Sequence, residues 1–321
     1  MKTIYETKSN GKMKQNNNDN EILLTDLINY LFRKSLHIFL VVLIFGICGV
    51  IYSLLLPNKY TSEALLVSSQ SGSGSELKSL ASQYGGIAAL AGINLSGGES
   101  SRLEQSVELL KSWYFVEIVI VKYGWKPSLM AANYWNAELG ELELDQELFD
   151  SETMSWKGID DKNLEPSSWE TFSVVEDNFI VSFDNKTGFI QVSFEHLSPQ
   201  FASEFVTVMI EELNAYFKSL DVQASRSNIE FLKEKIEKTE YKEMQNVFYK
   251  MIEDQSKTLM LATANSEYLV RSIIPAKVAE VKSSPSRIII CITITFVGGT
   301  LAILYFLISF LYRESQNDHK Q

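Results

Sequence analysis

The residue types that most often bind metals or carry catalysis are few and scattered in this sequence. The three histidines, His37, His196 and His319, lie inside an apolar run, after an alternating apolar stretch and near the end of the chain. No H-E-x-x-H segment places two imidazoles on one helix face to bind zinc, and Cys48 and Cys291 form no paired cysteine motif. We therefore expect no metal site, no bound cofactor and no catalytic residues.

Two further stretches have compositions that can bind ligands, but neither has the required spacing. The segment "SGSGSELKS" (residues 71–79) lacks the third glycine and the correctly spaced lysine of a phosphate-binding loop, so we interpret it as a flexible loop. The acidic segment "ELGELELDQELFDSE" (residues 138–152) offers paired carboxylates, yet it matches no calcium-binding loop. We interpret it as a solvated face.

Several tryptophans leave two interpretations open: Trp125, Trp135, Trp156 and Trp169. Their indole rings are able to stack on sugar rings. Buried core positions and contacts between subunits are the commoner fates of tryptophan, and we favour these.

Two long apolar runs, residues 36–56 and 288–312, contain no Asp, Glu, Lys or Arg. A helix needs ~20 residues to cross a hydrocarbon core ~30 Å thick, and both runs are long enough. The first run follows a long polar leader and precedes no small-x-small cleavage pattern, which indicates an uncleaved anchor. We predict two transmembrane helices with these bounds.

Basic residues near the first run decide the predicted orientation. Four precede it and one follows it closely: Lys12, Lys14, Arg33 and Lys34, and then Lys59. Positive charge favours the cytoplasmic side, so the N-terminus is predicted to be cytoplasmic. The charges around the second run favour the opposite orientation, but long loops are translocated largely regardless of charge. Both termini are then cytoplasmic, and residues 57–287 form a periplasmic domain.

The remaining flanks are short. Residues 1–20 are polar and Asn-rich and are predicted to be a disordered cytoplasmic tail. Residues 21–35 have apolar positions at helical spacing and are predicted to form a juxtamembrane helix on the inner membrane surface. Residues 313–321 form a second cytoplasmic tail. The formal net charge of −11 argues against a nucleic-acid partner.

The domain between the spans contains signals for both strands and helices. Residues 59–69 are typical of a strand, and residues 76–95 of a helix interrupted by glycines. Residues 101–123 predict one amphipathic helix, which Gly124 ends. We expect residues 126–170 to form short helices and loops.

A β-hairpin and then long helices follow. Residues 179–195 contain two alternating apolar runs around Asp-Asn-Lys-Thr-Gly, which predicts a hairpin. Ser198 is the candidate N-cap of the next helix, and Pro199 is its first residue. Neither Gly nor Pro occurs from Gln200 to Ile274, so we predict extended helices over about residues 198–272. Because the chain must return, the helix reverses within either "LDVQASRSN" or "EKTEYK".

Prolines and an arginine mark the entries to the two spans: Pro57, Pro275, Pro285 and Arg287. Pro275 is expected to end the returning helix, and Pro285 to stop helical structure from continuing into the second span. Arg287 and Lys282 are positioned to contact lipid headgroups. The alternative is a plain linker with incidental prolines.

Small residues within the spans provide faces on which helices can approach closely. They are Gly46, Gly49 and Ser53 in the first run and Thr295, Gly298, Gly299 and Ala302 in the second. Two interpretations remain open: the small residues allow helices to pack within or between subunits, or they are merely tolerated at positions exposed to lipid.

The order of these features resembles the Wzz-type chain-length determinants, also called polysaccharide co-polymerases. The resemblance is carried by the two terminal spans, by "LLLPNKYTSEALL" at the end of the first span and by "FYKMIEDQSKTLMLATANSEYLVRSIIPA". Val278 and Val281 stand where many members of this family carry prolines. No G-x-x-x-x-G-K-[ST] loop occurs, so the chain is similar to the class without a kinase domain.

The resemblance implies an α+β fold with a membrane-proximal α/β base and a long protruding helical hairpin. It also implies a ring-like homo-oligomer, an octamer, in the bacterial inner membrane. The expected function is non-enzymatic control of the modal length of O-antigen or a related undecaprenyl-linked polysaccharide. The expected partners are a separate polymerase, the lipid-linked polysaccharide and membrane lipids. Two other functions remain open: a two-span sensor, and an adaptor or scaffold of an envelope transport complex.

Overall fold

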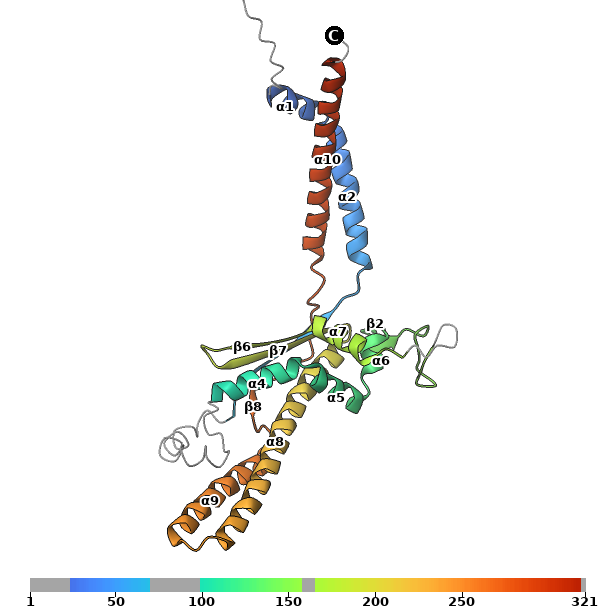
Figure 1. The fold of residues 1–321 in the computed structure, drawn as a ribbon. Helices are drawn as coiled ribbons and strands as arrows, with labels where there is room; N and C mark the ends of the chain where they lie inside the picture. Colours follow the sequence, from blue (N-terminus) through green and yellow to red (C-terminus); the bar gives the residue numbers. More distant parts are fainter. Residues whose placement is uncertain (1–23, 70–98, 158–164, 319–321) are drawn as a thin grey trace, which may run out of the picture. The chain divides into compact units, whose positions relative to one another are not determined.

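A computed structural model describes residues 24–69, 99–157 and 165–318 (Figure 1). The chain divides into two compact units, one made of Met1–Leu55 with Ser286–Gln321 and the other of Leu56–Pro285. The predicted tail at residues 1–20, the loop at 71–79 and the interrupted helix at 76–95 lie outside the described residues.

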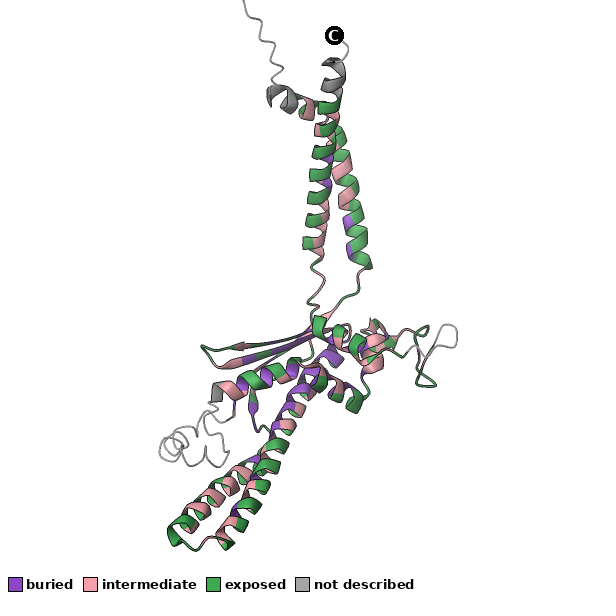
Figure 2. Ribbon diagram, in the orientation of Figure 1, coloured by how far each residue is buried: buried purple, intermediate pink, exposed green. Residues whose placement is uncertain are grey.

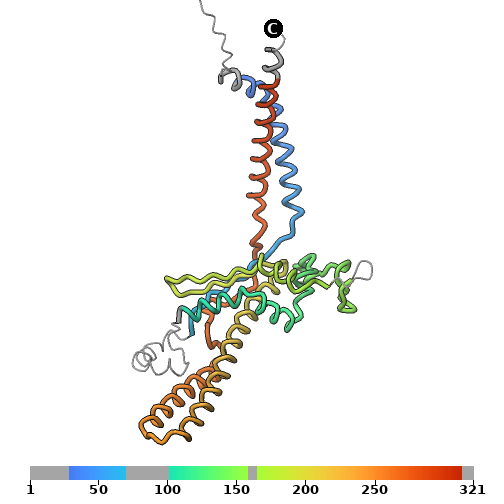
Figure 3. The backbone as a smooth tube through the Cα atoms, viewed as in Figure 1, coloured from blue at the N-terminus to red at the C-terminus, as the bar shows by residue number. Residues whose placement is uncertain are grey.

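In its described residues the first unit contains the helices α1 (Leu24–Arg33), α2 (Ser35–Leu55) and α10 (Arg287–Asp318). Helices α2 and α10 run side by side in opposite directions, as the backbone trace shows (Figure 3). The described helices that are long and apolar enough to cross a membrane are Ser35–Leu55 and Arg287–Tyr312. Helix α10 continues beyond the predicted end of the second span, because no helix-breaking residue follows Tyr312.

The apolar side chains of α2 and α10 are largely exposed. Leu36 is 73% exposed, Phe39 64% and Phe296 71%. A helix in the core of a soluble protein buries such side chains. Leaving them exposed to water costs about 25 cal/mol of free energy per Å² of apolar surface. Exposure on this scale favours a lipid environment for both helices.

The second unit is built on a four-stranded antiparallel sheet with the strand order β6-β7-β1-β8. Strands β6 (Phe179–Asp184) and β7 (Phe189–His196) form the predicted hairpin, and Gly188 adopts φ +73° in its turn. Strand β1 (Tyr60–Ser68) lies between β7 and β8 (Val270–Ile274). The prediction of mixed helices and strands is confirmed.

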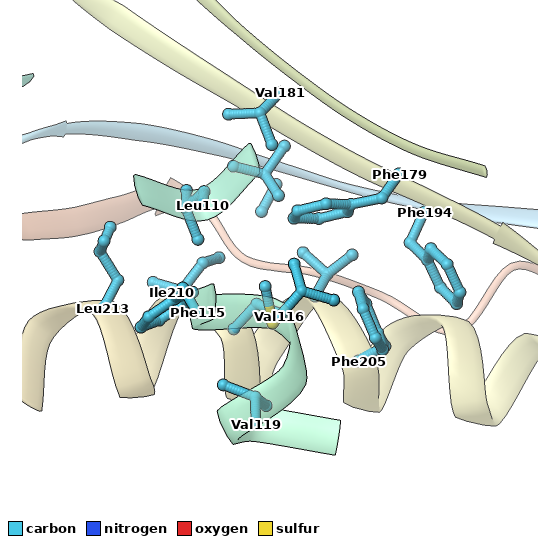
Figure 4. Packing of buried hydrophobic residues seen from close by; sticks show 14 of the residues in the cluster. Leu110, Phe115, Val116, Val119, Phe179, Val181, Phe194, Phe205, Ile210 and Leu213 are labelled. Atoms are coloured by element: carbon cyan, nitrogen blue, oxygen red, sulfur yellow. The ribbon is translucent and has the colours of Figure 1, made fainter. Parts of the chain in front are cut away.

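One face of this sheet is apolar and packs on helices. In β1, Ala64 and Leu66 are buried; they pair with Val192 and Ile190 of β7. This alternation is what a strand with one buried face requires. Figure 4 shows the resulting core between these strands and α4, α5 and α8, with Phe194 and Phe205 among its fully buried side chains.

The predicted amphipathic helix at residues 101–123 is in fact two helices, α4 (Glu99–Lys111) and α5 (Trp113–Tyr123). Ser112 separates them: its Oγ donates to the carbonyl of Leu109 (2.7 Å) and accepts from the backbone N–H of Phe115 (3.3 Å). The change of direction allows both helices to bury apolar residues in the same core. Gly124 ends α5 with φ +67°, as predicted.

Residues 126–170 differ from the prediction of short helices and loops. They form α6 (Lys126–Met130), a hairpin of β2 (Ala132–Asn136) and β3 (Glu141–Leu144), a second of β4 (Phe149–Asp150) and β5 (Ser155–Trp156), and the start of α7 (Ser168–Asn178). The acidic segment supplies turn residues. Asp145 and Asp150 accept backbone N–H groups two and three residues ahead.

The long helices form a hairpin of α8 (Pro199–Glu237) and α9 (Lys242–Ala264). Ser198 caps α8 by accepting from the N–H of Phe201 at 3.2 Å. The reversal lies within "EKTEYK", the second of the two predicted positions, where the Gln245 side chain donates to the carbonyl of Thr239 at 2.7 Å. Buried residues concentrate in the half of α8 next to the sheet, and the far half of the hairpin is mostly exposed (Figure 2).

The predicted helix over residues 198–272 is too long at its C-terminal end. Helix α9 ends at Ala264, and residues 270–274 form strand β8, so Pro275 follows a strand rather than ending a helix. The absence of Gly and Pro did not reveal this end. Val270, Ile273 and Ile274 are β-branched, and pairing with β1 outweighs their helical context.

Asn214, a buried residue of α8, fixes the returning chain to the helix. Its side-chain oxygen accepts from the backbone N–H groups of Leu269 (2.8 Å) and Val270 (3.0 Å), and its amide donates to the carbonyl of Val270 (3.0 Å). Asn214 is only 4% exposed. A buried amide with all three bonds formed holds β8 in register against α8.

Two ionic clusters tie other helices to α8. Asp221 accepts from Arg102 of α4 (2.6 Å) and from the hydroxyl of Tyr268 (2.5 Å), which lies just before β8. Burial, followed by the bond to Asp221, raises the pKa of Tyr268. Glu212 accepts from Lys122 (2.7 Å) and Tyr123 (2.8 Å) of α5.

Asn214→Ala is expected to lower the free energy of unfolding of the second unit by about 2–4 kcal/mol, because three buried backbone groups lose their partner. The measurement is guanidinium denaturation of the full chain in detergent, followed by tryptophan fluorescence. All five tryptophans lie between residues 113 and 169, so this signal reports on the second unit.

Asn228→Ala is the matched control, because Asn228 also lies on α8 but forms only a 3.4 Å bond to Gln255. We expect this variant to stay within about 0.5 kcal/mol of the native chain. Equal losses in the two variants would contradict the role assigned to Asn214.

His196 predicts a pH dependence of stability. It is 8% exposed, its Nε2 lies 2.9 Å from the carbonyl of Ser128, and its Nδ1 accepts from the N–H of Ser198 at 3.1 Å. Burial lowers the pKa of His196 to about 4. Between pH about 6.5 and about 4 the unfolded chain therefore binds a proton that the folded chain does not, and stability falls by on the order of 3 kcal/mol.

The check is the difference in unfolding free energy between pH 7 and pH 4.5, compared for the native chain and His196→Gln. Lowered carboxyl pKa values act in both proteins, so the comparison isolates the histidine. The variant should show the smaller loss on acidification. A loss as large as that of the native chain would exclude His196 as the cause.

Candidate functional site

In the first unit, small residues of α2 and α10 lie against each other within one chain. A Cβ atom built at Gly46 would lie 3.5 Å from Thr295 Oγ1, and one at Gly49 would lie 3.3 Å from Ile294 Cβ. One at Gly299 would lie 3.5 Å from Val42. Ser53 and Ala302, the two other small positions singled out, are also buried.

Gly298 is the tightest of these positions. A Cβ atom there would lie 2.5 Å from Phe45 Cβ and still closer to Phe45 Cγ, far inside van der Waals contact. Aromatic pairs extend the same antiparallel contact, with ring centroids of Tyr30 and Phe310 5.1 Å apart. Without a hydrophobic drive between helices in lipid, close packing of this kind is what holds two spans together.

The two segments through which the chain enters and leaves the second unit, around Lys59 and around Ser284, lie beside each other. The N–H of Lys59 donates to the carbonyl of Ser284 (2.9 Å), and the N–H of Ser283 donates to the carbonyl of Lys59 (2.9 Å). Side chains add to the pairing: the hydroxyl of Thr61 donates to that of Ser283 (2.7 Å), and that of Ser62 to the carbonyl of Lys277 (2.9 Å). The chain therefore leaves and re-enters this unit at one place.

The prolines bracket this pairing. Pro57 precedes it, Pro285 follows Ser284 directly, and Pro275 lies immediately after β8. Residues 275–286 contain no helix, as expected of a stretch bounded by residues that lack an amide donor. Arg287 is the first residue of α10 and belongs to the first unit.

The side chain of Lys59 makes contacts that the sequence pattern does not predict. Its Nζ donates to the Oδ1 of Asn178 at 3.1 Å and lies 3.7 Å from the carboxylate of Glu195. Lys59 was considered only as a positive charge near the first span. The sequence offers one signal for these contacts: Lys59 begins the predicted strand and directly precedes β1, so its side chain lies close to the neighbouring strands.

The structure also separates the tryptophans. Trp125 is 6% exposed and packs between aromatic residues of the core, and Trp156 packs on Phe149 with centroids 5.0 Å apart. Trp169 instead is 64% exposed. Within residues 24–69, 99–157 and 165–318, no group of three or more His, Cys, Asp or Glu is arranged to hold a metal ion.

Gly298→Ala is expected to lower the thermal stability of the α2–α10 pair, because the added methyl group overlaps Phe45. Gly299→Ala is the control: its methyl group meets only ordinary contact with Val42, and alanine favours a helix over glycine by about 1 kcal/mol. The measurement is thermal unfolding of the full chain in detergent by far-ultraviolet circular dichroism.

The double variant Gly298→Ala with Phe45→Ala tests the cause, since removal of the ring makes space for the methyl group. We expect it to recover part of the stability that Gly298→Ala loses. If Gly298→Ala and Gly299→Ala behave alike, the close contact with Phe45 does not hold the pair.

The family model "Wzz: Chain length determinant protein" matches residues 20–122. A search of curated proteins found no match. Among solved structures, a full-length bacterial polysaccharide co-polymerase is similar at 10% identity and a TM-score of 0.38, covering 91% of this chain and 98% of that chain.

A fragment of WzzB, a polysaccharide co-polymerase from Salmonella Typhimurium, is similar at 13% identity and a TM-score of 0.29, covering 71% of this chain and 100% of that chain. The residues that the family model matches include α1, α2, β1, α4 and nearly all of α5. The match covers about a third of the chain, and this part is similar to the chain length determinant family.

Proposed function

We propose that this protein regulates the chain length of a polysaccharide without catalysing a reaction itself. The observation that carries the proposal is the match of the chain length determinant model to residues 20–122. The expected substrate class is O-antigen or a related glycan on undecaprenyl, which a separate polymerase extends.

We propose a two-pass topology in the bacterial inner membrane, with both termini in the cytoplasm and residues 57–287 in the periplasm. The excess of basic residues before the first span supports the orientation. The opposite directions of α2 and α10 support an even number of crossings. The paired entry segments at Lys59 and Ser284 support a base that leaves and returns to one membrane surface.

The membrane-entry residues then have distinct roles. Pro57, Pro275 and Pro285 keep the two connections non-helical, so that the spans and the outer unit fold as separate bodies. Arg287 begins the second span, where a cation is favourable near anionic lipid headgroups.

We propose a homo-oligomer, and a ring of eight copies is the expectation from the family resemblance. The far half of the α8–α9 hairpin supports lateral contacts between copies. Phe231 is 51% exposed, Met244 45% and Met260 71%. These apolar side chains remain exposed along the hairpin, where a neighbouring copy could cover them.

The mechanism that fits these features is geometric. Hairpins from neighbouring copies pack side by side, and the assembly holds the polymerase or the growing chain until a characteristic length is reached. In this mechanism the small residues of α2 and α10 preserve the span pair that anchors each copy: Gly46, Gly49, Ser53, Thr295, Gly298, Gly299 and Ala302.

Deletion of the gene is expected to broaden or shift the distribution of polysaccharide lengths while polymerisation continues, because a different protein forms the glycosidic bonds. The measurement is the ladder of lipid-linked polysaccharide on a gel. Expression of the native chain from a plasmid should restore the original modal length. An unchanged ladder in the deletion strain would refute the proposed function.

A further inference from the structure

We propose that the outer unit carries a surface that binds sugar rings, formed by Trp113, Trp169 and Phe172 beside a small concavity between α5 and α7. The inference rests on the proposed function, and it identifies where the protein contacts the polysaccharide directly. The ligand class is a neutral or weakly charged pyranose within the glycan chain.

The first observation is a fixed pair of indole rings. The rings of Trp113 and Trp169 are stacked with centroids 5.1 Å apart and planes inclined by 11°. Trp113 Nε1 donates to the hydroxyl of Ser168 at 2.9 Å, which sets the orientation of its ring. Phe172 packs edge-on against Trp169 with a centroid distance of 6.0 Å and an angle of 82°. Two helices thus hold Trp169 without covering it.

The second observation is the exposure of this ring. Trp169 remains 64% exposed although it contacts Trp113 and Phe172, whereas Trp125 is 6% exposed. Apolar surface of this size is normally removed from water. A rigid exposed indole loses little conformational entropy on binding, so it is a preorganised platform for a flat apolar surface. The C–H face of a pyranose ring is such a surface.

The third observation is the set of groups beside the platform. The residues that line the concavity are of two kinds: apolar Val116, Ile120, Val121 and Phe172, and polar Glu117, Lys126, Ser168 and Thr171. Phe172 belongs to both the concavity and the aromatic cluster. Lys126 is held by an ion pair with Glu165 at 2.7 Å. A few polar groups at the edge of an apolar surface are the usual composition of a small-molecule site.

These groups favour a sugar over a second copy of the chain. The hydroxyl groups at the edge of a pyranose can hydrogen-bond to Glu117 and Ser168 while the ring face stacks on Trp169. An apolar helix from another copy would desolvate Glu117 and Lys126 without satisfying them, which costs free energy. The described residues give Glu117 no side-chain hydrogen bond or ion pair of its own, so its carboxylate is available to a ligand.

The test uses the full chain in detergent and an oligosaccharide of several repeating units, released from the producing cell's own polysaccharide and labelled with a fluorophore at its reducing end. Binding is measured by fluorescence anisotropy. Trp169→Ala should weaken binding about 3- to 10-fold, the range expected for loss of one aromatic stacking contact. Glu117→Gln should weaken it to a smaller extent.

Tyr134→Ala is the matched control, because Tyr134 is an exposed aromatic residue of β2 outside the platform, with 58% exposure. The Tyr134→Ala variant should bind the labelled oligosaccharide with the same affinity as the native chain. Light scattering on the same samples reports the oligomeric state, and circular dichroism reports folding. Trp169 is exposed, so its replacement should leave both unchanged.

Three results would overturn the inference: no saturable binding by the native chain, equal affinities of Trp169→Ala and the native chain, or a change of oligomeric state in Trp169→Ala that accounts for its weaker binding. The last would assign the surface to contacts between copies. The deletion ladder is independent of these results. A shifted ladder combined with unaltered binding by Trp169→Ala would preserve the proposed function and reject this site.

Discussion

The backbone of Lys59 donates to Ser284 and accepts from Ser283, and this pairing brings together two positions separated by almost the whole sequence of the second unit. A chain with an apolar run near each end has to satisfy this constraint if both runs enter one bilayer. Strand β1 begins directly after the pairing and lies between β7 and β8 in the sheet. The long α8–α9 hairpin can extend from the sheet only because its two ends are fixed there, one by the cap at Ser198 and the other by Asn214.

Much of this architecture could be predicted from local sequence signals. The two spans, the β6–β7 hairpin, the start of α8 at Ser198 and the end of α5 at Gly124 each depend on residues close together in the chain. The division at Ser112 and the strand at Val270–Ile274 could not be predicted in this way. Both are set by contacts with distant partners, the shared core in one case and β1 in the other. The local spacing of apolar residues alone predicts a continuous helix both at Ser112 and at Val270–Ile274.

The candidate functional residues show the same limit. Small residues of the spans were identified by type, but the overlap between Gly298 and Phe45 depends on the relative position of two helices far apart in sequence. Four tryptophans were considered equally able to stack on sugar. Only the structure distinguishes buried Trp125, which packs against Phe201 and Phe205 of α8, from Trp169, which stays exposed on α7. Asn214 has no local signal at all, since an asparagine within a helix is usually solvated.

The central position of β1 has a consequence for biogenesis. This strand leaves the ribosome soon after the first span, yet its neighbours β7 and β8 lie more than a hundred residues later in the chain. Pairing of such distant segments carries a large loop-closure cost and is slow. Until translation reaches Val270, one edge of β1 has no strand to pair with. The nascent domain thus exposes an unprotected strand for most of its synthesis, and it completes its sheet only shortly before the second span is made.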